Sequence, residues 1–359
     1  MIELDRRRFL QIAGSASLMS AVGGRLGWAS TARFVYIGAE HAIHVYSVSA
    51  DERLVERQTM VSALPVAMAI RGGRLYVANG VSQYGNLPRG SVEAYAIDQT
   101  TGRLEWMNRV PLSLSGTAPR DLAVAPDGRS VVVAVHGGGA YNVLSLDEDG
   151  RLGRVSGILK EVGSGPHPLQ TTAHPAAVMF DREGRVLTAD QGSDRLNVLA
   201  LSDGELTVSS RCEVSAGSGP GCMVLHPYGR RVYVAHALNG AVSSFAYDAS
   251  GSLRCRQTVF APAMGGVATL AMHPSGEVLY SSHGDAVQSW KIDGEGRLDA
   301  LGETDAVQAN KLMVTPDGGS LLALNGDGVL RMKIDKVTRM LVDPVRVASL
   351  AKPLSVAIV

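Results

Sequence analysis

Short apolar runs alternate with turns rich in glycine and proline from about residue 33 to the end of the chain, and they form two series. In the first series each run follows a Gly/Pro loop: 64–70, 119–125, 175–180, 220–225, 267–272, 311–315 and 353–359. In the second series each run follows a turn glycine: Gly73, Gly128, Gly184, Gly229, Gly276 and Gly318. Two such runs joined by a tight turn are typical of a β-hairpin. The pattern therefore predicts an all-β protein.

The hairpins repeat at the period of a β-propeller. The turn glycines lie 42 to 56 residues apart, which is the spacing of four-stranded propeller blades. Residues 34–38 are a seventh copy of the second series without a preceding partner, and residues 353–359 are a first-series run without a following one. Pairing these two runs closes a ring and hides two sheet edges. The sequence thus predicts a seven-bladed propeller of four-stranded blades over residues 30–359, closed by the C-terminal strand joining blade 1.

One face of the predicted ring gathers most of the polar loop residues. The loop that enters a blade and the loop after its second strand share that face, around the central channel. One residue per blade is expected there at the end of the second strand: Ala39, Asn79, Val135, Asp190, His236, His283 and Asn325. The entry loops add Arg120, His174 and Lys311, and His136 lies close by. We expect a concave, polar mouth, the usual place for a ligand in a closed β-ring. His226 and His273 fall in turns of the opposite face and are interpreted as turn residues.

The hairpin of blade 4 carries the most promising acid–base pair. Its two strands fold back around about residue 182, so His174 is predicted to lie roughly opposite Asp190. A carboxylate beside an imidazole fixes its tautomer and raises its basicity. Asp194, in the loop after the second strand, is a weaker candidate for the same task.

Composition narrows the range of partners. The chain has 34 basic and 34 acidic residues, so no strong field favours nucleic acid or an anionic membrane. The chain has three cysteines, Cys212, Cys222 and Cys255. We expect them on different strands at different distances from the channel axis, and therefore without a disulfide bond. The expected ligand is therefore a small molecule, with no cofactor, and a monomer is favoured.

The N-terminus is interpreted as a targeting signal. Arg6 and Arg7 belong to a twin-arginine pattern, and the apolar run 12–22 behind them is too short to span a bilayer. Residues 27–29 are typical of a cleavage site. We expect residues 1–29 to be a signal peptide for the twin-arginine (Tat) pathway, which would place the propeller domain, residues 30–359, in the periplasm; an uncleaved membrane anchor is the alternative.

The chain resembles the seven-bladed β-propeller lactonases, the family that contains 6-phosphogluconolactonase and is related to the carboxymuconate lactonising enzymes. The resemblance covers about residues 33–359, and the motifs that carry it are 116–120, 126–129, 137–139, 163–170, His174, 190–194 and 217–220. Departures from the family pattern fall at positions where the family carries its chemistry: Leu169, Ala176, Gly221, Cys222 and Ala237.

Three hypotheses follow from the residues and the resemblance. The first is an exported hydrolase of a sugar lactone or a similar cyclic ester. His174 would be its general base and Asp190 or Asp194 the group that orients the base. The set expected to bind its substrate is Arg120, His136, Gln170, His236, His283 and Lys311. The second is a non-catalytic periplasmic propeller that binds a ligand or a partner protein. The third is a metal-binding propeller that uses His136, His236 and His283 with a carboxylate.

Overall fold

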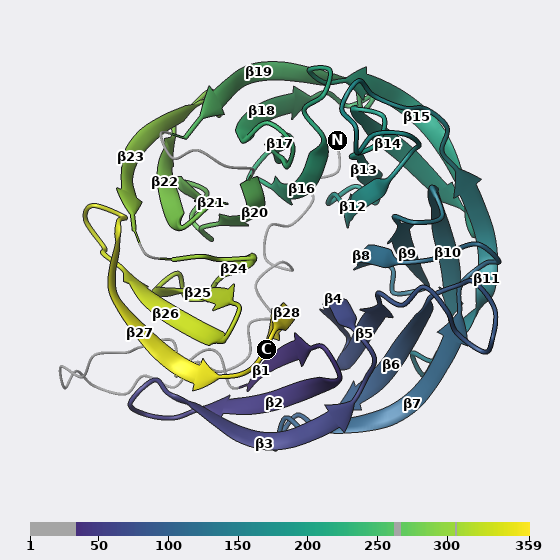
Figure 1. The fold of residues 1–359 in the computed structure, drawn as a ribbon, viewed down its shortest axis with the longest axis horizontal. Helices are drawn as coiled ribbons and strands as arrows, with labels where there is room; N and C mark the ends of the chain where they lie inside the picture. Colours follow the sequence, from purple (N-terminus) through teal and green to yellow (C-terminus); the bar gives the residue numbers. More distant parts are fainter. Residues whose placement is uncertain (1–33, 262–266, 306) are drawn as a thin grey trace, which may run out of the picture.

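Seven four-stranded antiparallel sheets surround a central channel (Figure 1). This computed structural model describes residues 34–261, 267–305 and 307–359, and every regular element in them is a strand. The expected signal peptide, residues 1–29, lies outside the described residues. The all-β class, the seven blades and the four strands per blade are therefore as predicted.

Each blade runs outward from the channel through four consecutive positions. The innermost strands of blades 1 to 7 are β28 (Pro353–Ile358), β4 (Pro65–Arg71), β8 (Pro119–Val124), β12 (Pro175–Phe180), β16 (Pro220–Leu225), β20 (Val267–Met272) and β24 (Lys311–Val314). The second strands are β1 (Phe34–Ala39), β5 (Arg74–Asn79), β9 (Ser130–Val135), β13 (Val186–Asp190), β17 (Arg231–His236), β21 (Val278–His283) and β25 (Ser320–Asn325). The third strands are β2 (Ala42–Val48), β6 (Ser91–Ile97), β10 (Ala140–Leu146), β14 (Arg195–Ser202), β18 (Ala241–Tyr247), β22 (Ala286–Ile292) and β26 (Gly328–Ile334). The outermost strands are β3 (Leu54–Val61), β7 (Leu104–Pro111), β11 (Leu152–Lys160), β15 (Glu205–Glu213), β19 (Leu253–Phe260), β23 (Leu298–Thr304) and β27 (Leu341–Ser349).

The core lies between neighbouring blades. Second strands such as β1 are buried along their full length, because each is covered on both faces by an adjacent blade. Outermost strands such as β3 alternate between exposed and half-buried residues. One apolar cluster, for example, joins Tyr76 and Val92 of blade 2 to Val131 and Val133 of blade 3. The continuous apolar runs of the sequence are therefore the parts of each blade that its neighbours cover.

The C-terminal strand closes the ring as the sequence predicts. β28 pairs antiparallel with β1, with Val356 opposite Ile37. The Phe34 and Val359 main chains exchange two hydrogen bonds of 3.0 Å. The Ser355 hydroxyl donates to the Pro65 carbonyl of blade 2, at 2.5 Å. The last strand of the chain thus completes the first blade and binds the next one.

The two faces of the ring differ in their connections. We call the face with the loops after the second and outermost strands the mouth face, and the opposite face, with the turns after the first and third strands, the turn face. The seven predicted strand-end residues, from Ala39 to Asn325, are each the last residue of a second strand on the mouth face. The residue-by-residue alignment of the blades is therefore confirmed.

A recurrent β-bulge shapes the channel wall at the mouth. The register of the inner strands shifts between Pro65 and Ala67, Pro119 and Asp121, Pro175 and Ala177, and Pro220 and Cys222. The skipped residues are Val66, Arg120, Ala176 and Gly221, each directly after a proline. A bulged residue has no cross-strand partner, so its side chain can be directed away from the sheet.

Candidate functional site

The central channel holds a cavity of about 410 Å³ to which all seven blades contribute. Its lining residues are Val66, Arg120, Asp121, Ala176, Ala177, Val178, Met179, Gly221, Cys222, Met223, Thr269, Asn310, Lys311 and Leu354. Bulged residues of four inner strands are among them, and only Arg120 of these carries a charge. Arg120 and Lys311, both predicted substrate-binding residues, are thus brought together in one cavity of a size usual for small-molecule sites.

Arg120 and Lys311 share the cavity with one carboxylate, Asp121, and both favour its charged form. Asp121 accepts hydrogen bonds from the main-chain N–H groups of Leu122 and Val178, both at 3.0 Å. Burial raises the pKa of the Asp121 carboxyl, while Lys311 and Arg120 act in the opposite direction. Burial lowers the pKa of Arg120, which nevertheless remains a cation at neutral pH. The cavity therefore offers positive charge to a ligand, with Asp121 held by the main chain.

A pair of histidines lies beside Arg120. The rings of His136 and His174 stack with centres 4.6 Å apart and planes 14° apart. The Arg120 guanidinium donates to Gln191 Oε1 at 3.1 Å. Burial lowers the pKa of His136 to about 4, and the charge of Arg120 acts in the same direction. His136 is therefore neutral at pH 7, and Arg120 links the histidine pair to the channel.

The main chain holds His174 in a defined tautomer. His174 Nδ1 lies 3.1 Å from the carbonyl oxygen of His136, which can only accept a hydrogen bond. A neutral His174 ring therefore carries its proton on Nδ1, and its Nε2 lone pair has no hydrogen-bond donor among the residues that the structure describes. The His174 carbonyl in turn accepts from the Gln191 N–H at 3.0 Å. A half-buried imidazole with a bare Nε2 is suited to accept a proton from water.

Asp190 lies next to His174, as the hairpin predicts, but it binds the main chain and not the imidazole. Its Oδ1 accepts from the N–H groups of His174 at 2.7 Å and Gly192 at 2.9 Å. The expectation that this carboxylate orients the ring directly is wrong, because the His136 carbonyl occupies Nδ1 instead. The loop needs glycine at 192, since a Cβ there would lie 1.9 Å from the Thr172 carbonyl oxygen. Asp190 therefore positions the backbone that carries His174.

The buried side chains of Asp194 and Gln170 hold the loop that follows Asp190 through hydrogen bonds. Asp194 is 6% exposed and accepts from the N–H groups of Gly217 and Gly219, at 2.7 and 2.8 Å. The Gln170 amide, fully buried, donates to Asp194 Oδ1 and to the Gln191 carbonyl, both at 2.8 Å. The structure thus places these two predicted site residues as supports of the loop that carries Gln191, outside the lining of the channel cavity.

His236 and His283 point into their own blades. His236 is 2% exposed, with ring nitrogens 3.0 Å from Ser218 Oγ and 2.9 Å from Ser243 Oγ. His283 is 1% exposed and lies 2.6 Å from Ser281 Oγ. Burial lowers the pKa of both rings to about 4. The expectation that these two side chains face the mouth is wrong, because hydroxyl partners inside each blade hold them.

The histidine trio of the metal hypothesis is consequently not assembled. Within the parts of the chain that the structure describes, no three His, Cys, Asp or Glu side chains converge in a way that could hold a metal ion. Cys212, Cys222 and Cys255 are free thiols. Cys212 and Cys255 lie on the outermost strands β15 and β19, which corrects the expectation that all three differ in radius.

The turn face agrees with the sequence-based interpretation. His226 follows β16 and its Nε2 lies 2.9 Å from the Gly276 carbonyl oxygen of the next blade. His273 follows β20 and its Nε2 lies 3.1 Å from the Gly318 carbonyl oxygen. Each histidine therefore joins its turn to the following blade.

Sequence reasoning missed two residues of the site, Gln191 and Asp121. Gln191 lies in the 190–194 motif, which by itself predicts no role for it, although its side chain accepts a hydrogen bond from Arg120. Asp121 directly follows the bulged Arg120. The proline that starts the inner strand recurs in four blades just before the bulge, and this repeat was the sequence signal that could have identified residues 119–121 as part of the channel wall. The sequence placed the polar residues on the correct face without showing their directions.

Comparisons with known proteins agree with this architecture. Residues 29–358 match the sequence model of a family described as "Lactonase, 7-bladed beta-propeller". A 6-phosphogluconolactonase of Bacillus subtilis is 31% identical over 175 residues, which is 48% of this chain and 50% of the relative. An uncharacterized protein of Lactococcus lactis is 27% identical over 177 residues, 46% of this chain and 52% of the relative. The chain thus spans about half the length of each of these relatives.

Solved structures share the fold over almost the whole chain. The periplasmic gluconolactonase of Pseudomonas aeruginosa has a TM-score of 0.83 at 20% identity, covering 91% of this chain and 98% of that one. A protein from Lactobacillus plantarum has a TM-score of 0.84 at 20% identity, with coverage of 92% and 100%. Identities this low show the fold alone.

Proposed function

Because the chain belongs to the lactonase family of seven-bladed β-propellers, we propose that it hydrolyses a sugar lactone or a similar cyclic ester at the mouth of its central channel. The observation that carries this proposal is the arrangement around Arg120. This cation lines the channel and binds Gln191, beside a histidine pair whose His174 has a free Nε2. A base and an oxyanion partner are the two elements that ester hydrolysis requires of a protein.

The reaction can be written with these groups alone. His174 Nε2 takes a proton from water, and the hydroxide attacks the lactone carbonyl carbon. The oxyanion of the tetrahedral intermediate is stabilised by Arg120, with Lys311 as a second cation in the same cavity. The ring C–O bond then breaks, and the protonated His174 returns its proton to the leaving ring oxygen. The product is the open hydroxy acid, and both histidines end as they began.

His136 supports this role from its stacked position. Its pKa of about 4 keeps it neutral at pH 7, so it adds no positive charge beside His174. A second cation stacked at 4.6 Å would oppose protonation of the base. The neutral ring and its carbonyl thus favour the transient imidazolium.

A second function, ligand binding without catalysis, has one observation in its favour. The bulged positions Ala176 and Gly221 line the channel wall beside Arg120 and carry no functional group. A propeller with Arg120 and Lys311 as its cationic contacts in the described part of the channel could retain an anionic or polyol ligand without turning it over.

Direct assay separates the two functions. Purified protein is tested for hydrolysis of glucono-δ-lactone and of 6-phosphogluconolactone, with the spontaneous rate subtracted. We expect saturable hydrolysis and a loss of about a hundredfold in kcat/KM for Arg120→Ala, the scale of removing one oxyanion partner. Arg129→Ala, an exposed arginine of a blade-3 turn on the turn face, is the matched control and should retain the wild-type rate. Saturable binding without turnover would support the binding propeller and overturn the hydrolase.

We also propose that the protein is exported. The support is the Arg6–Arg7 pair followed by a short apolar run. Among the described residues no helix is long and apolar enough to cross a membrane. Replacing both arginines with lysine should leave the protein in the cytoplasm of a Tat-competent bacterium, as measured by cell fractionation. Unchanged delivery to the periplasm in a strain without the Tat translocase would contradict the proposal.

A further inference from the structure

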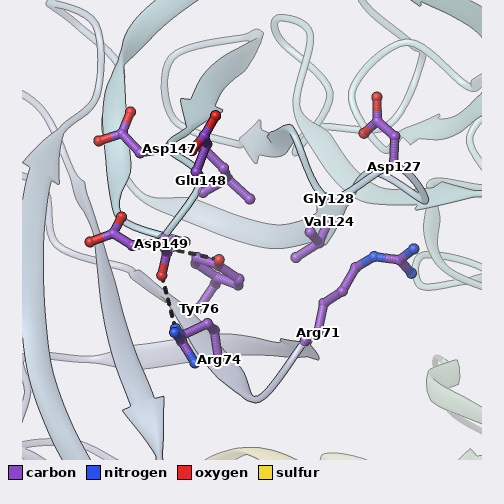
Figure 2. A pocket seen from close by; sticks show the side chains of 12 residues that line it. Arg71, Arg74, Tyr76, Val124, Asp127, Gly128, Asp147, Glu148 and Asp149 are labelled. Atoms are coloured by element: carbon purple, nitrogen blue, oxygen red, sulfur yellow. Dashed lines mark hydrogen bonds between the residues drawn. The ribbon is translucent and has the colours of Figure 1, made fainter.

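Two hollows on the turn face are built on the same framework. In the hollow between blades 2 and 3, Arg74 Nε donates to the Asp149 carbonyl at 3.1 Å and the Tyr76 hydroxyl donates to the Gly150 carbonyl at 2.9 Å (Figure 2). In the hollow between blades 5 and 6, Arg231 donates to the Gly294 carbonyl, and the Tyr233 hydroxyl to the Gly296 carbonyl at 3.3 Å. In both, an Arg-x-Tyr segment at the start of a second strand closes the gap to the next blade.

The two hollows differ in charge. The first, the acidic hollow, has a volume of about 300 Å³, and its charged lining residues are Arg71, Arg74, Asp127, Asp147, Glu148 and Asp149. The second, the basic hollow, has a volume of about 500 Å³, and its charged lining residues are Arg230, Arg231, Arg256, Arg297 and Glu295. The shared framework needs one arginine in each hollow. The other arginines of the basic hollow are therefore not explained by the contact between blades.

Those arginines remain available to a ligand. Arg230 pairs with Glu183 at 2.8 Å and Arg297 with Glu295 at 3.4 Å, and all four side chains are exposed. Exposed pairs of this kind contribute little stability and exchange readily with other anions. Arg256 is exposed and makes no ion pair or side-chain hydrogen bond with any residue that the structure describes. Four guanidinium groups thus surround one concavity in a chain whose total charge is balanced.

The chemistry of this hollow selects its ligand. A guanidinium presents a planar fork of N–H donors that matches the oxygen atoms of a phosphate group. Four arginines against the single carboxylate of Glu295 leave the hollow with an excess of positive charge, and a concave shape concentrates the resulting field. One carboxylate would engage only one or two of the three arginines that the blade contact does not use, whereas a chain of phosphates could reach all three. We propose that the basic hollow binds a ligand with clustered phosphate groups, at a site separate from the channel and on the opposite face of the ring.

Inorganic tripolyphosphate is the probe for this site. Isothermal titration at low salt, against sodium chloride of equal ionic strength, should show saturable binding with one site per chain. Arg256→Gln and Arg297→Gln should each weaken the binding about tenfold, the usual scale for one charge-assisted contact. Arg71→Gln in the acidic hollow is the matched control and should leave the affinity unchanged. Lactone hydrolysis should be unaffected by all three substitutions, because none of these residues lines the channel.

A second arm separates two sources of clustered phosphate. Binding to tripolyphosphate without binding to phosphatidylglycerol vesicles would support a free ligand. Binding to both, with both lost in Arg256→Gln, would support the phosphate groups of a lipid surface. The proposal is overturned if the wild-type protein binds neither probe, or if Arg256→Gln and Arg297→Gln bind tripolyphosphate as tightly as wild type.

Discussion

Blade 4 and blades 5 and 6 each carry a histidine near the mouth face, but the histidine side chains are held in different directions. In blade 4 the strand-end residue Asp190 turns inward to bind the loop backbone, which leaves His174 half-buried beside Arg120 and His136. In blades 5 and 6 the strand-end residues are the histidines themselves, and serine hydroxyls inside the blade hold them. Polarity at a strand end thus shows which face a residue approaches. The nearest hydrogen-bond partner decides whether it serves a ligand or the fold.

Both arrangements of the mouth face depend on a closed ring, and we expect the largest effect from removing the strand that closes it. Deleting residues 353–359 removes β28 and leaves β1 and β4 without the neighbour that covers them. We expect no soluble protein with a cooperative unfolding transition, because two sheet edges and part of the core become exposed. A truncated chain that melts like the full one in calorimetry would contradict the closure.

The dependence of stability on acidic pH tests the buried histidines of blades 5 and 6, His236 and His283. Their folded pKa values of about 4 lie below the value near 6.5 expected for an unfolded chain. Between these values the unfolded chain binds more protons, so the free energy of unfolding should fall as the pH decreases from 6.5 to 4. We expect a loss on the order of 1–3 kcal/mol for each histidine by urea denaturation.

Two variants check the origin of this acid sensitivity. His236→Gln and His283→Gln should flatten the pH dependence, whereas His41→Gln, at an exposed site, should leave its slope unchanged. An equally steep loss of stability in a variant that lacks both buried histidines would assign the effect to other groups.

The positioning role of Asp190 predicts a smaller effect that joins stability to rate. Asp190→Ala removes the acceptor of the His174 and Gly192 N–H groups, and we expect it to cost about 2 kcal/mol in unfolding free energy. It should also lower kcat more than it raises KM, because the base is displaced. Asp190→Asn keeps an oxygen acceptor and should rescue most of both losses. A rate loss in Asp190→Asn as large as in Asp190→Ala would indicate a role for the charge itself.

The smallest expected effect is at His226 on the turn face. His226→Ala removes the hydrogen bond to the Gly276 carbonyl and the one from the Tyr228 N–H, and it should cost about 1 kcal/mol of stability at this exposed turn. Lactone hydrolysis should be unchanged, since the residue lies on the face opposite the mouth. A loss of turnover without a loss of stability would show that the functional site lies on the turn face and not on the mouth face.

The sequence was sufficient for the fold and for placing the seven strand-end residues on the mouth face. Periodic turn glycines and an unpaired run at each end determined seven blades and their closure, and the seven second strands end at the residues predicted. Side-chain direction was not readable in the same way. Whether His174 or His236 turns outward depends on the His136 carbonyl in one case and on Ser218 and Ser243 in the other. His136 lies 38 residues from His174, and Ser218 lies 18 residues from His236, so no local pattern shows these two partners.

The grouping of charged side chains in the channel could not be predicted from the sequence for a related reason. Arg120 enters the channel because a β-bulge removes its cross-strand partner. Its closeness to Lys311 results from ring closure across blades 3 and 7. The sequence identifies Arg120 and Lys311 as candidate substrate-binding residues from their positions at the entry to blades 3 and 7. Only the assembled ring brings them into one cavity with Asp121.

The most direct measurement is kcat/KM for lactone hydrolysis at pH 7 in His174→Ala and His236→Ala, assayed together with the fraction of folded protein. We predict that His174→Ala loses a hundredfold or more, the usual scale for a positioned base, and melts near the wild-type temperature. His236→Ala should lose stability and, per folded molecule, stay within about threefold of the wild-type rate. A His174→Ala variant that turns over like wild type, or a His236→Ala variant that folds normally and is inactive, would contradict the account.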